Sequence, residues 1–253
     1  MHTLLVILIY DVLLNLLGFA ISAPLQTERI YDIFGAATFI GMTVIMMIRD
    51  LSWPQVVAGA CVLTWALRLG ILLGIRGFKV GDRRFDDFKK NPLKFLQLWV
   101  GQMAWGYITA LPVYFYLNNE AQFSAWNVVG FLVYSGGFSL EVAADRQKSK
   151  FKYANPSEPF MGGLFKFCRH PNYLGEIVLW FGMYLYSLGG FHEWWEYFSV
   201  INTGFVYALL KFGSGARLSE KEQNRKYGTR PDWKEYMEST NCLFPKISSF
   251  RRK

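Results

Sequence analysis

The chain has 253 residues, of which 52% are hydrophobic and 18% are charged, and its formal net charge is +8. The apolar residues are gathered in long blocks, which excludes a soluble domain, a disordered chain and a small disulfide scaffold. The composition therefore indicates a helical membrane protein, and we expect residues 1–253 to form a single membrane-embedded domain.

Seven apolar blocks follow one another, and each has a length suited to crossing a hydrocarbon core of about 30 Å. The predicted helices span 3–24, 31–48, 53–75, 95–117, 125–143, 171–189 and 194–210. The first block resembles a signal peptide in its position and in its small residues Ser22 and Ala23. Its uncharged flank and the polar Asp11 and Asn15 favour a retained helix instead. We expect an all-α, polytopic protein with about seven transmembrane helices.

The basic residues are concentrated in three segments, 76–94, 144–170 and 211–253, which hold 24 of the 27 Lys and Arg side chains. Seven crossings place these segments on one face, because they follow the third, fifth and seventh helices. Cationic loops stay in the cytoplasm, so we expect the N-terminus outside and 211–253 as a cytoplasmic tail. The expected location is the endoplasmic reticulum membrane in a eukaryote or the plasma membrane in a bacterium.

The one-faced charge also bears on partners, because diffuse basicity would suggest nucleic acid and this distribution does not. We expect the lipid bilayer and an apolar lipid or steroid-like substrate as partners, no nucleic acid, and leave the oligomeric state open. The three cysteines, Cys61, Cys168 and Cys242, are odd in number and lack metal-ligand spacing. We therefore expect neither a disulfide nor a metal site.

Charged side chains inside the predicted helices are informative, because each costs roughly 2.5 to 3.5 kcal/mol at a helix centre. Such residues either form interhelical hydrogen bonds or belong to a functional site. The residues in question are Asp11, Asp32, Arg68, Glu141 and Glu176.

A dense motif surrounds Glu176 and favours a functional site there. The glycines Gly162 and Gly163 permit a close turn, and Pro171 suits the first turn of a helix. The motif reads Gly162-Gly163-Leu164-Phe165, then Arg169-His170-Pro171-Asn172-Tyr173-Leu174-Gly175-Glu176. Glu141 and Asp145, four residues apart, share a face at the end of the fifth helix.

A second polar cluster lies in the predicted tail, on the same face of the membrane as the first. It contains Arg217, Glu220, Arg225, Tyr227 and the run from Arg230-Pro231 to Tyr236. Together the two clusters predict an entrance lined with cations, amides and hydroxyls.

These motifs resemble the steroid 5α-reductase superfamily of membrane enzymes, and within it the DUF1295 branch. The resemblance rests on residues 145–152, on the Arg169 to Glu176 string, and on Tyr227-Gly228 and Arg230 to Tyr236 in the tail. It extends from about residue 60 to 245 and implies seven transmembrane helices. The Arg169-His170-Pro171 and Gly175-Glu176 elements are shared with isoprenylcysteine and phospholipid methyltransferases.

The resemblance implies that NADPH binds in the cytoplasmic half of the protein. The implied cofactor-binding residues are Asp145, Arg146, Lys152, His170, Asn172, Tyr173, Glu176, Arg217, Arg225, Tyr227 and Tyr236. A dinucleotide with a pyrophosphate and a 2′-phosphate needs several cations, which this face supplies. Contact with anionic lipid headgroups is the alternative explanation for the same basic residues.

The implied reaction is hydride transfer to a C=C bond conjugated with a carbonyl, in a steroid-like or other lipid enone. In the resembling reductases a glutamate on the second helix and a tyrosine on the third polarise the carbonyl. Asp32 and Trp65 stand nearest to these places here, with Arg68 three residues beyond, and we take these three as the catalytic candidates. The Trp65 indole donates a hydrogen bond but no proton. Asp32 is either a neutral carboxylic acid acting as donor or a carboxylate at a helix start.

Two other functions fit the same motifs. A methyltransferase using S-adenosylmethionine shares the Arg169-His170-Pro171 string, but its cationic cofactor would not need so many Lys and Arg side chains. Such enzymes usually carry adjacent glutamates, whereas Lys221 separates Glu220 from Glu222. A non-catalytic sterol-binding protein is favoured only by Trp65 in place of the expected tyrosine.

Overall fold

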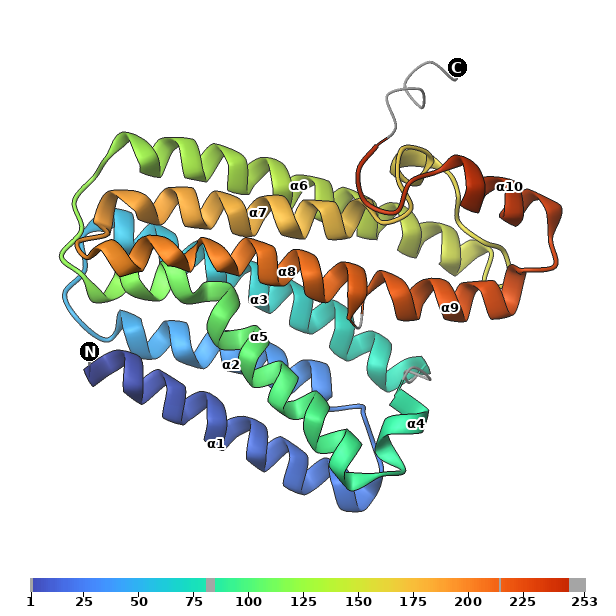
Figure 1. Cartoon of the computed structure of the whole chain (residues 1–253), viewed down its shortest axis with the longest axis horizontal. Coiled ribbons are helices and arrows are strands. Elements are labelled where there is room, and N and C mark those ends of the chain that lie inside the picture. The colour runs from blue at the N-terminus through green and yellow to red at the C-terminus, as the bar shows by residue number, and fades with distance from the viewer. Residues whose placement is uncertain (1, 81–84, 214, 246–253) are drawn as a thin grey trace. The chain divides into compact units, whose positions relative to one another are not determined.

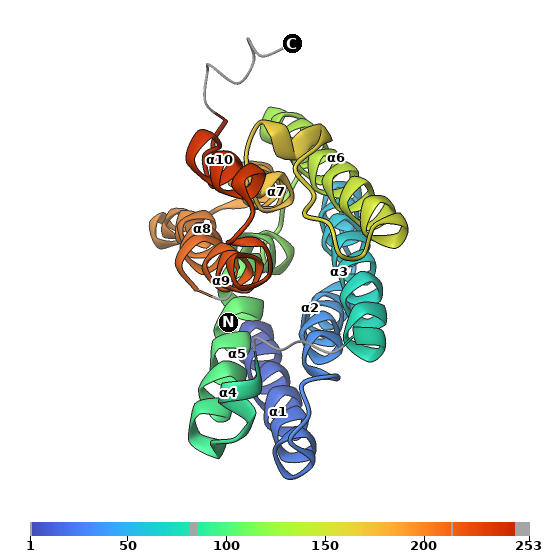
Figure 2. The ribbon, with the colours of Figure 1, turned by 90° about the vertical axis from the view of Figure 1, so that its right-hand side faces the viewer.

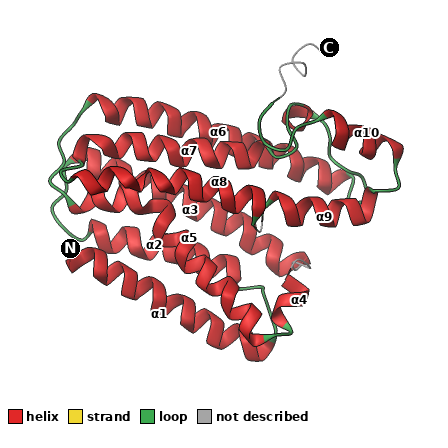
Figure 3. Cartoon of the chain, in the orientation of Figure 1, coloured by secondary structure: helices red, strands yellow, loops and turns green. Residues whose placement is uncertain are grey.

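The computed structural model describes residues 2–80, 85–213 and 215–245, and every regular element in these ranges is a helix (Figure 3). This confirms the expected all-α class. The helices are α1 (His2–Leu25), α2 (Tyr31–Met47), α3 (Trp53–Val80), α4 (Asp86–Lys89), α5 (Pro92–Asn118), α6 (Ala125–Ala154), η2 (Gly163–Lys166), α7 (Pro171–Ser187), η3 (Leu188–Gly190), η4 (Trp194–Val200), α8 (Ile201–Phe212), α9 (Ala216–Tyr227) and α10 (Pro231–Ser239). The predicted cationic segments 76–94 and 211–253 include 81–84, 214 and 246–253, which lie outside the described residues.

All seven apolar blocks are helical, but several predicted boundaries are wrong. The third and fifth predicted helices continue to Val80 and Ala154, through charged residues that a search for apolar runs discards. The fourth begins earlier, at Pro92, because the Asn91 side chain accepts hydrogen bonds from the amides of Leu93 and Lys94 and caps the helix. The block 194–210 is divided into a 3₁₀ segment, η4, and the α-helix α8.

Within the described ranges, three helices are long and apolar enough to cross a membrane by length and composition. They are His2–Leu25, Trp53–Ile75 within α3, and Ala125–Ala154. Tyr31–Met47 is a shorter apolar helix. These helices fit a membrane protein.

The chain forms two compact units, each made of two stretches of sequence. The first unit comprises Met1–Gly130 and Met183–Asn202, and the second comprises Phe131–Gly182 and Thr203–Lys253. In the first unit α5 packs against α1, α2, α3 and α4 (Figure 2). Its core is aromatic, with the buried Trp65 meeting both Phe39 and Trp105 edge-on.

A closed polar network joins α1, α2 and α5 inside this core. The Asn15 amide donates to Asp11 Oδ1 at 2.7 Å and to Thr38 Oγ1 at 3.0 Å, and the Gln102 amide donates to Asn15 Oδ1 at 2.9 Å. All four side chains are buried. Hydrogen bonds of this kind are the usual means by which single polar residues tie membrane helices together.

In the second unit α6 and α7 lie side by side and approach each other closely at two glycines (Figure 1). A β-carbon added at Gly175 would lie 2.6 Å from the backbone nitrogen of Glu141, and one at Gly137 would collide with the backbone of Leu179. The absence of side chains at Gly137 and Gly175 therefore brings the backbones together and sets Glu141 beside the first turns of α7.

Candidate functional site

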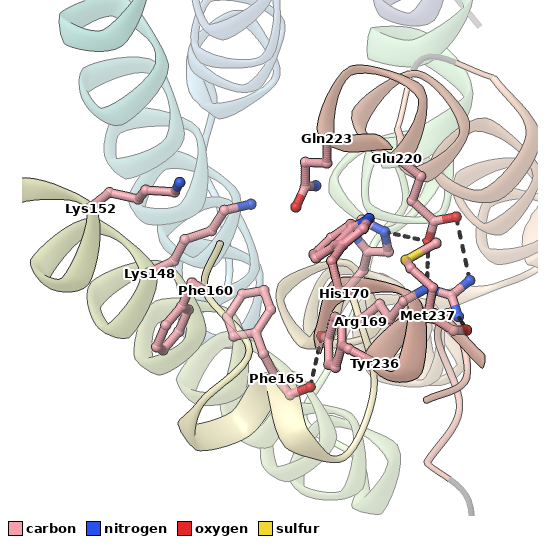
Figure 4. A pocket seen from close by; sticks show the side chains of 11 residues that line it. Lys148, Lys152, Phe160, Phe165, Arg169, His170, Glu220, Gln223, Tyr236 and Met237 are labelled. Carbon is pink, nitrogen blue, oxygen red and sulfur yellow. Dashed lines mark hydrogen bonds and ion pairs between the residues drawn. The ribbon is translucent and has the colours of Figure 1, made fainter. Parts of the chain in front are cut away.

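The second unit contains a pocket whose walls are both cationic and aromatic (Figure 4). The empty space within and in front of it is about 340 Å³, part of which is open solvent. The lining residues are Lys148, Lys152, Phe160, Phe165, Arg169, His170, Glu220, Gln223, Trp233, Tyr236 and Met237.

The turn before α7 forms the aromatic wall, and it is fixed by hydrogen bonds. Gly163 has a φ of +55°, a left-handed conformation that favours glycine. The Gln147 side chain accepts a hydrogen bond from the Leu164 amide at 2.9 Å, and the Tyr236 hydroxyl donates to the Phe165 carbonyl at 2.9 Å. The glycine pair thus has the turn-forming role that its sequence predicted.

Two lysines from the end of α6 line the pocket, as Figure 4 shows. Lys148 Nζ lies 5.6 Å from the centre of the Phe165 ring. Lys152 Nζ donates to the Tyr227 hydroxyl at 2.8 Å and to the Glu158 carbonyl at 2.6 Å. Both amines lie where an anionic ligand would meet them.

A carboxylate-centred network holds Arg169 and His170 at the pocket. Arg169 Nε donates to Glu220 Oε1 at 2.8 Å, and His170 Nε2 lies 3.0 Å from the same oxygen. Arg169 Nη1 also donates to the carbonyls of Met237 and Thr240. The main chain adds two bonds, from the Arg169 amide to the Asn241 carbonyl and from the His170 amide to the Cys242 carbonyl. Arg169 therefore binds the segment after α10 to the start of α7.

The network controls the charges of its members. Burial alone would raise the pKa of Glu220, but hydrogen bonds from His170 and Arg169 outweigh it and hold that pKa at about 2. Burial lowers the pKa of His170 despite the opposing hydrogen bond to Glu220. The pocket wall therefore carries an ionised carboxylate beside a neutral imidazole.

The polar face of α6 continues from the pocket toward the helix crossing. Glu141, Asp145, Lys148 and Lys152 are spaced by four, three and four residues, so they share one face of the helix. This face is acidic at Glu141, which is buried, and cationic where the two lysines line the pocket.

The predicted cofactor residues on α7 lie in its first turns. Asn172 Oδ1 is buried and accepts no hydrogen bond from the described part of the chain. Tyr173 stacks in parallel on His170, with ring centres 4.9 Å apart, and Glu176 is buried. A buried amide oxygen without a donor is unfavourable unless a ligand or water supplies one.

The structure brings together only part of the set predicted for the cofactor. Lys152, His170 and Tyr236 line the pocket, and Tyr227 contacts Lys152. Arg146, Arg217 and Arg225 are exposed and do not line it, and Arg225 forms an ion pair with Glu222 at 2.8 Å. Asp145 is half-buried on α6.

The three predicted catalytic residues belong to the first unit. Asp32 lies in the first turn of α2. The N-cap residue of that helix, Ile30, makes no side-chain capping hydrogen bond. Trp65 is buried in the aromatic core, and Arg68 is half-buried one turn further along α3. Because α3 continues to Val80, Arg68 lies further from the helix end than predicted.

Sequence reasoning did not assign several lining residues to the site. Lys148 was within reach, because it continues the spacing of Glu141 and Asp145 by one helical turn. Glu220 was predicted only as a member of the second polar cluster and not as a cofactor-binding residue. Its pairing with Arg169 joins residues 51 apart in sequence, which no local pattern indicates. Trp233, Gln223 and Met237 likewise reach the pocket only through tertiary folding.

His170, Glu220 and Cys242 bring possible metal-ligand atoms within 4.8 Å of one another. The carboxylate of this group is already engaged, since Arg169 donates to Oε1 at 2.8 Å and to Oε2 at 3.3 Å. A guanidinium therefore stands where a metal cation would have to bind, and we do not treat the group as a metal site.

Comparison with known proteins places the chain in a family. The family described as "Protein of unknown function (DUF1295)" matches residues 18–240. The chain belongs to the DUF1295 family. This confirms the resemblance found in the motifs, and the match includes α2, α5 and all the residues that line the pocket.

One relative is "Uncharacterized protein C594.04c" of Schizosaccharomyces pombe, which is 27% identical over 165 residues. The match includes 56% of this chain and 46% of the relative, so the chain spans less than half of that protein's length. No solved structure matches the chain.

Proposed function

We propose that the protein is a multi-pass membrane oxidoreductase that uses NADPH to reduce a conjugated C=C bond in a steroid-like or other lipid enone. One observation carries the proposal: the polar face of α6 is acidic at Glu141 and Asp145 and cationic at Lys148 and Lys152. This face matches a ligand with a neutral, amide-bearing end and a polyanionic end. A nicotinamide dinucleotide phosphate is such a ligand.

The residues present fit the cofactor in charge and in shape. Lys148 and Lys152 would hold phosphates, and the rings of Phe160, Phe165 and Tyr236 offer apolar surfaces against which adenine would stack. Asn172, whose buried Oδ1 lacks a donor, and Glu176 would meet the nicotinamide end.

NADPH supplies the hydride in this chemistry, and the product also takes up one proton at the carbon next to the carbonyl. The chain's own part is to bind, orient and polarise. Asp32, Trp65 and Arg68 remain our candidates for polarising the substrate carbonyl, since developing negative charge there needs hydrogen-bond donors or cations. The buried aromatic residues around Trp65 suit an apolar substrate.

The membrane arrangement belongs to the same proposal. Seven crossings, with the N-terminus outside and the tail in the cytoplasm, would place α9, α10 and the lysines of α6 on the cytoplasmic side. The three long apolar helices support this arrangement in part. The membrane would be that of the endoplasmic reticulum in a eukaryote or the plasma membrane in a bacterium.

Isothermal titration of the detergent-purified protein with NADPH tests the proposal directly. We expect saturable binding, and a rise in thermal stability as NADPH exceeds its dissociation constant. Lys148→Met should weaken binding about tenfold or more, since a charge-assisted contact is lost. Lys150→Met is the matched control, because Lys150 is exposed on the same helix and does not line the pocket.

Titration with S-adenosylmethionine tests the alternative that the protein is a methyltransferase. Saturable binding of that compound without NADPH binding would contradict the reductase and favour a methyltransferase. Binding of NADPH with no turnover of any lipid enone would instead favour the non-catalytic sterol-binding alternative.

A further inference from the structure

Glu220 is the centre of the polar network at the pocket, although it was not among the predicted site residues. Its Oε1 accepts a hydrogen bond from Arg169 Nε at 2.8 Å and lies 3.0 Å from His170 Nε2. Its Oε2 accepts a longer bond from Arg169 Nη2 at 3.3 Å. The Glu220 side chain keeps 20% of its surface exposed, whereas that of His170 keeps only 3%.

The partners of Glu220 dictate which imidazole nitrogen carries the proton. An ionised carboxylate only accepts hydrogen bonds, so His170 Nε2 must be the protonated nitrogen. A neutral imidazole has one N–H, which leaves Nδ1 as an acceptor. No hydrogen bond to Nδ1 is formed by the part of the chain that the structure describes.

The ring cannot easily turn to exchange its two nitrogens. Tyr173 stacks on it in parallel, with an angle of 6° between the rings, and the backbone amide of His170 is bound to the Cys242 carbonyl. The stacking acts on the ring itself, and the backbone bond fixes the main chain from which that ring projects into the pocket lining.

We propose that Glu220 is a positioning residue, which fixes His170 as the Nε2-protonated tautomer and so gives the pocket a neutral acceptor at Nδ1. The ligand group that this acceptor would bind carries an N–H or O–H donor, such as a sugar hydroxyl or an exocyclic amine. The identity of that ligand as NADPH rests on the proposed function. The tautomer itself does not, because Glu220 imposes it without ligand.

Nitrogen-15 NMR of histidine-labelled protein reads the tautomer directly. The chain has three histidines, so substituting His2 and His192 by Asn leaves His170 as the one labelled ring. We expect a neutral ring protonated at Nε2 at pH 7. A ring protonated at Nδ1, or a fully charged ring, would overturn the proposal without any variant of Glu220.

Glu220→Gln supplies the second measurement. The Gln carboxamide can donate through its nitrogen as well as accept through its oxygen, so we expect a mixture of tautomers and an NADPH dissociation constant raised about tenfold. Glu235→Gln, an exposed position on α10, is the matched control and should leave both quantities unchanged. An unaltered tautomer in Glu220→Gln would contradict the positioning role.

The two proposals fail in different ways. If the free protein shows the Nε2-protonated ring and yet binds no NADPH, the proposed function fails and the role of Glu220 stands. If NADPH binds with equal affinity to wild type and to Glu220→Gln, the role of Glu220 in ligand recognition fails and the proposed function stands.

Discussion

Two of this protein's polar networks, one in each unit, join segments in similar ways but differ in what surrounds them. In the first unit Asn15 links Asp11, Thr38 and Gln102, and all four side chains are buried. In the second unit Glu220 links Arg169 and His170 at the wall of a pocket. The first network is enclosed within the protein core, whereas the second lies at the wall of a pocket that Lys148 and Lys152 also line.

The difference teaches how to assign a role to a buried polar group. A network that is fully enclosed by apolar side chains contributes to helix association, and its loss should lower stability alone. A network at a pocket wall contributes to stability and also orients groups for binding. Substitutions in the two networks should therefore separate these two effects.

Asn15→Leu should have the largest effect on stability. It leaves Asp11 Oδ1, Thr38 Oγ1 and the Gln102 amide without their partner in a buried core, at a cost of about 3 kcal/mol. Thermal unfolding in detergent would measure this cost, and the surviving folded protein should bind NADPH with unchanged affinity. Leu13→Ala, at a position that is 62% exposed on the same helix, is the control. A loss of NADPH affinity in Asn15→Leu would show that the closed network is not only structural.

Arg169→Met should have a smaller effect on stability but a clear effect on binding. The substitution removes the ion pair with Glu220 and the bonds to the Met237 and Thr240 carbonyls, at a cost of about 2 kcal/mol. Titration should show an NADPH dissociation constant raised about tenfold, because the pocket wall loses both a cation and its support. Lys166→Met is the control, because Lys166 is exposed and lies in the turn before α7. If Arg169→Met bound NADPH normally, the distinction between the two networks would be lost.

Acid should weaken the second network. The pKa of Glu220 is about 2 when folded against 4.5 ordinarily, so its stabilising contribution is present above about pH 4.5 and is lost as the pH falls toward 2. The lowered pKa of His170 acts in the same direction below about pH 6.5, where the unfolded chain takes up a proton that the folded chain resists. We expect the free energy of unfolding to fall by about 2 kcal/mol between pH 7 and pH 3, which the shift of the unfolding midpoint would measure. In Glu220→Gln the loss of stability below about pH 4.5 should disappear. An unfolding midpoint that rose on acidification would contradict the stabilising role of the ionised Glu220.

Lys221→Ala should have the smallest effect. Its side chain is exposed on α9 and does not line the pocket, so stability should change by less than about 0.5 kcal/mol and NADPH affinity should not change. The same measurements as above apply. A large loss of affinity would indicate that general positive charge, and not the pocket, attracts the cofactor.

The sequence predicted helices better than it predicted where they end. The apolar runs located α1, α2 and α7 within two residues at each end, because hydropathy reports burial or lipid contact directly. The hydropathy pattern failed to locate the end of α6, because this helix continues to Ala154 through charged residues that have good helix propensity. These turns carry Lys148 and Lys152, which both line the pocket, and of the two only Lys152 was predicted as a cofactor-binding residue.

Part of the site was also predictable, where its residues share a local motif. His170 and Tyr236 were identified from strings typical of the family, and both line the pocket. Glu220 was not, because its role depends on contacts with Arg169 and His170 some fifty residues earlier. Arg217 and Arg225 were cofactor contacts implied by the resemblance, and both are exposed and do not line the pocket.

The bonds from Arg169 and His170 to the carbonyls of Asn241 and Cys242 have a consequence for biosynthesis. A ribosome makes the chain from its N-terminus, and early helices can insert and pack before later ones exist. The pocket wall, however, includes main-chain partners that appear only when residue 242 has been made. The wall of the pocket is therefore complete only after all the described helices have been synthesised, and any ligand that aided folding by binding there would act late in translation or after it.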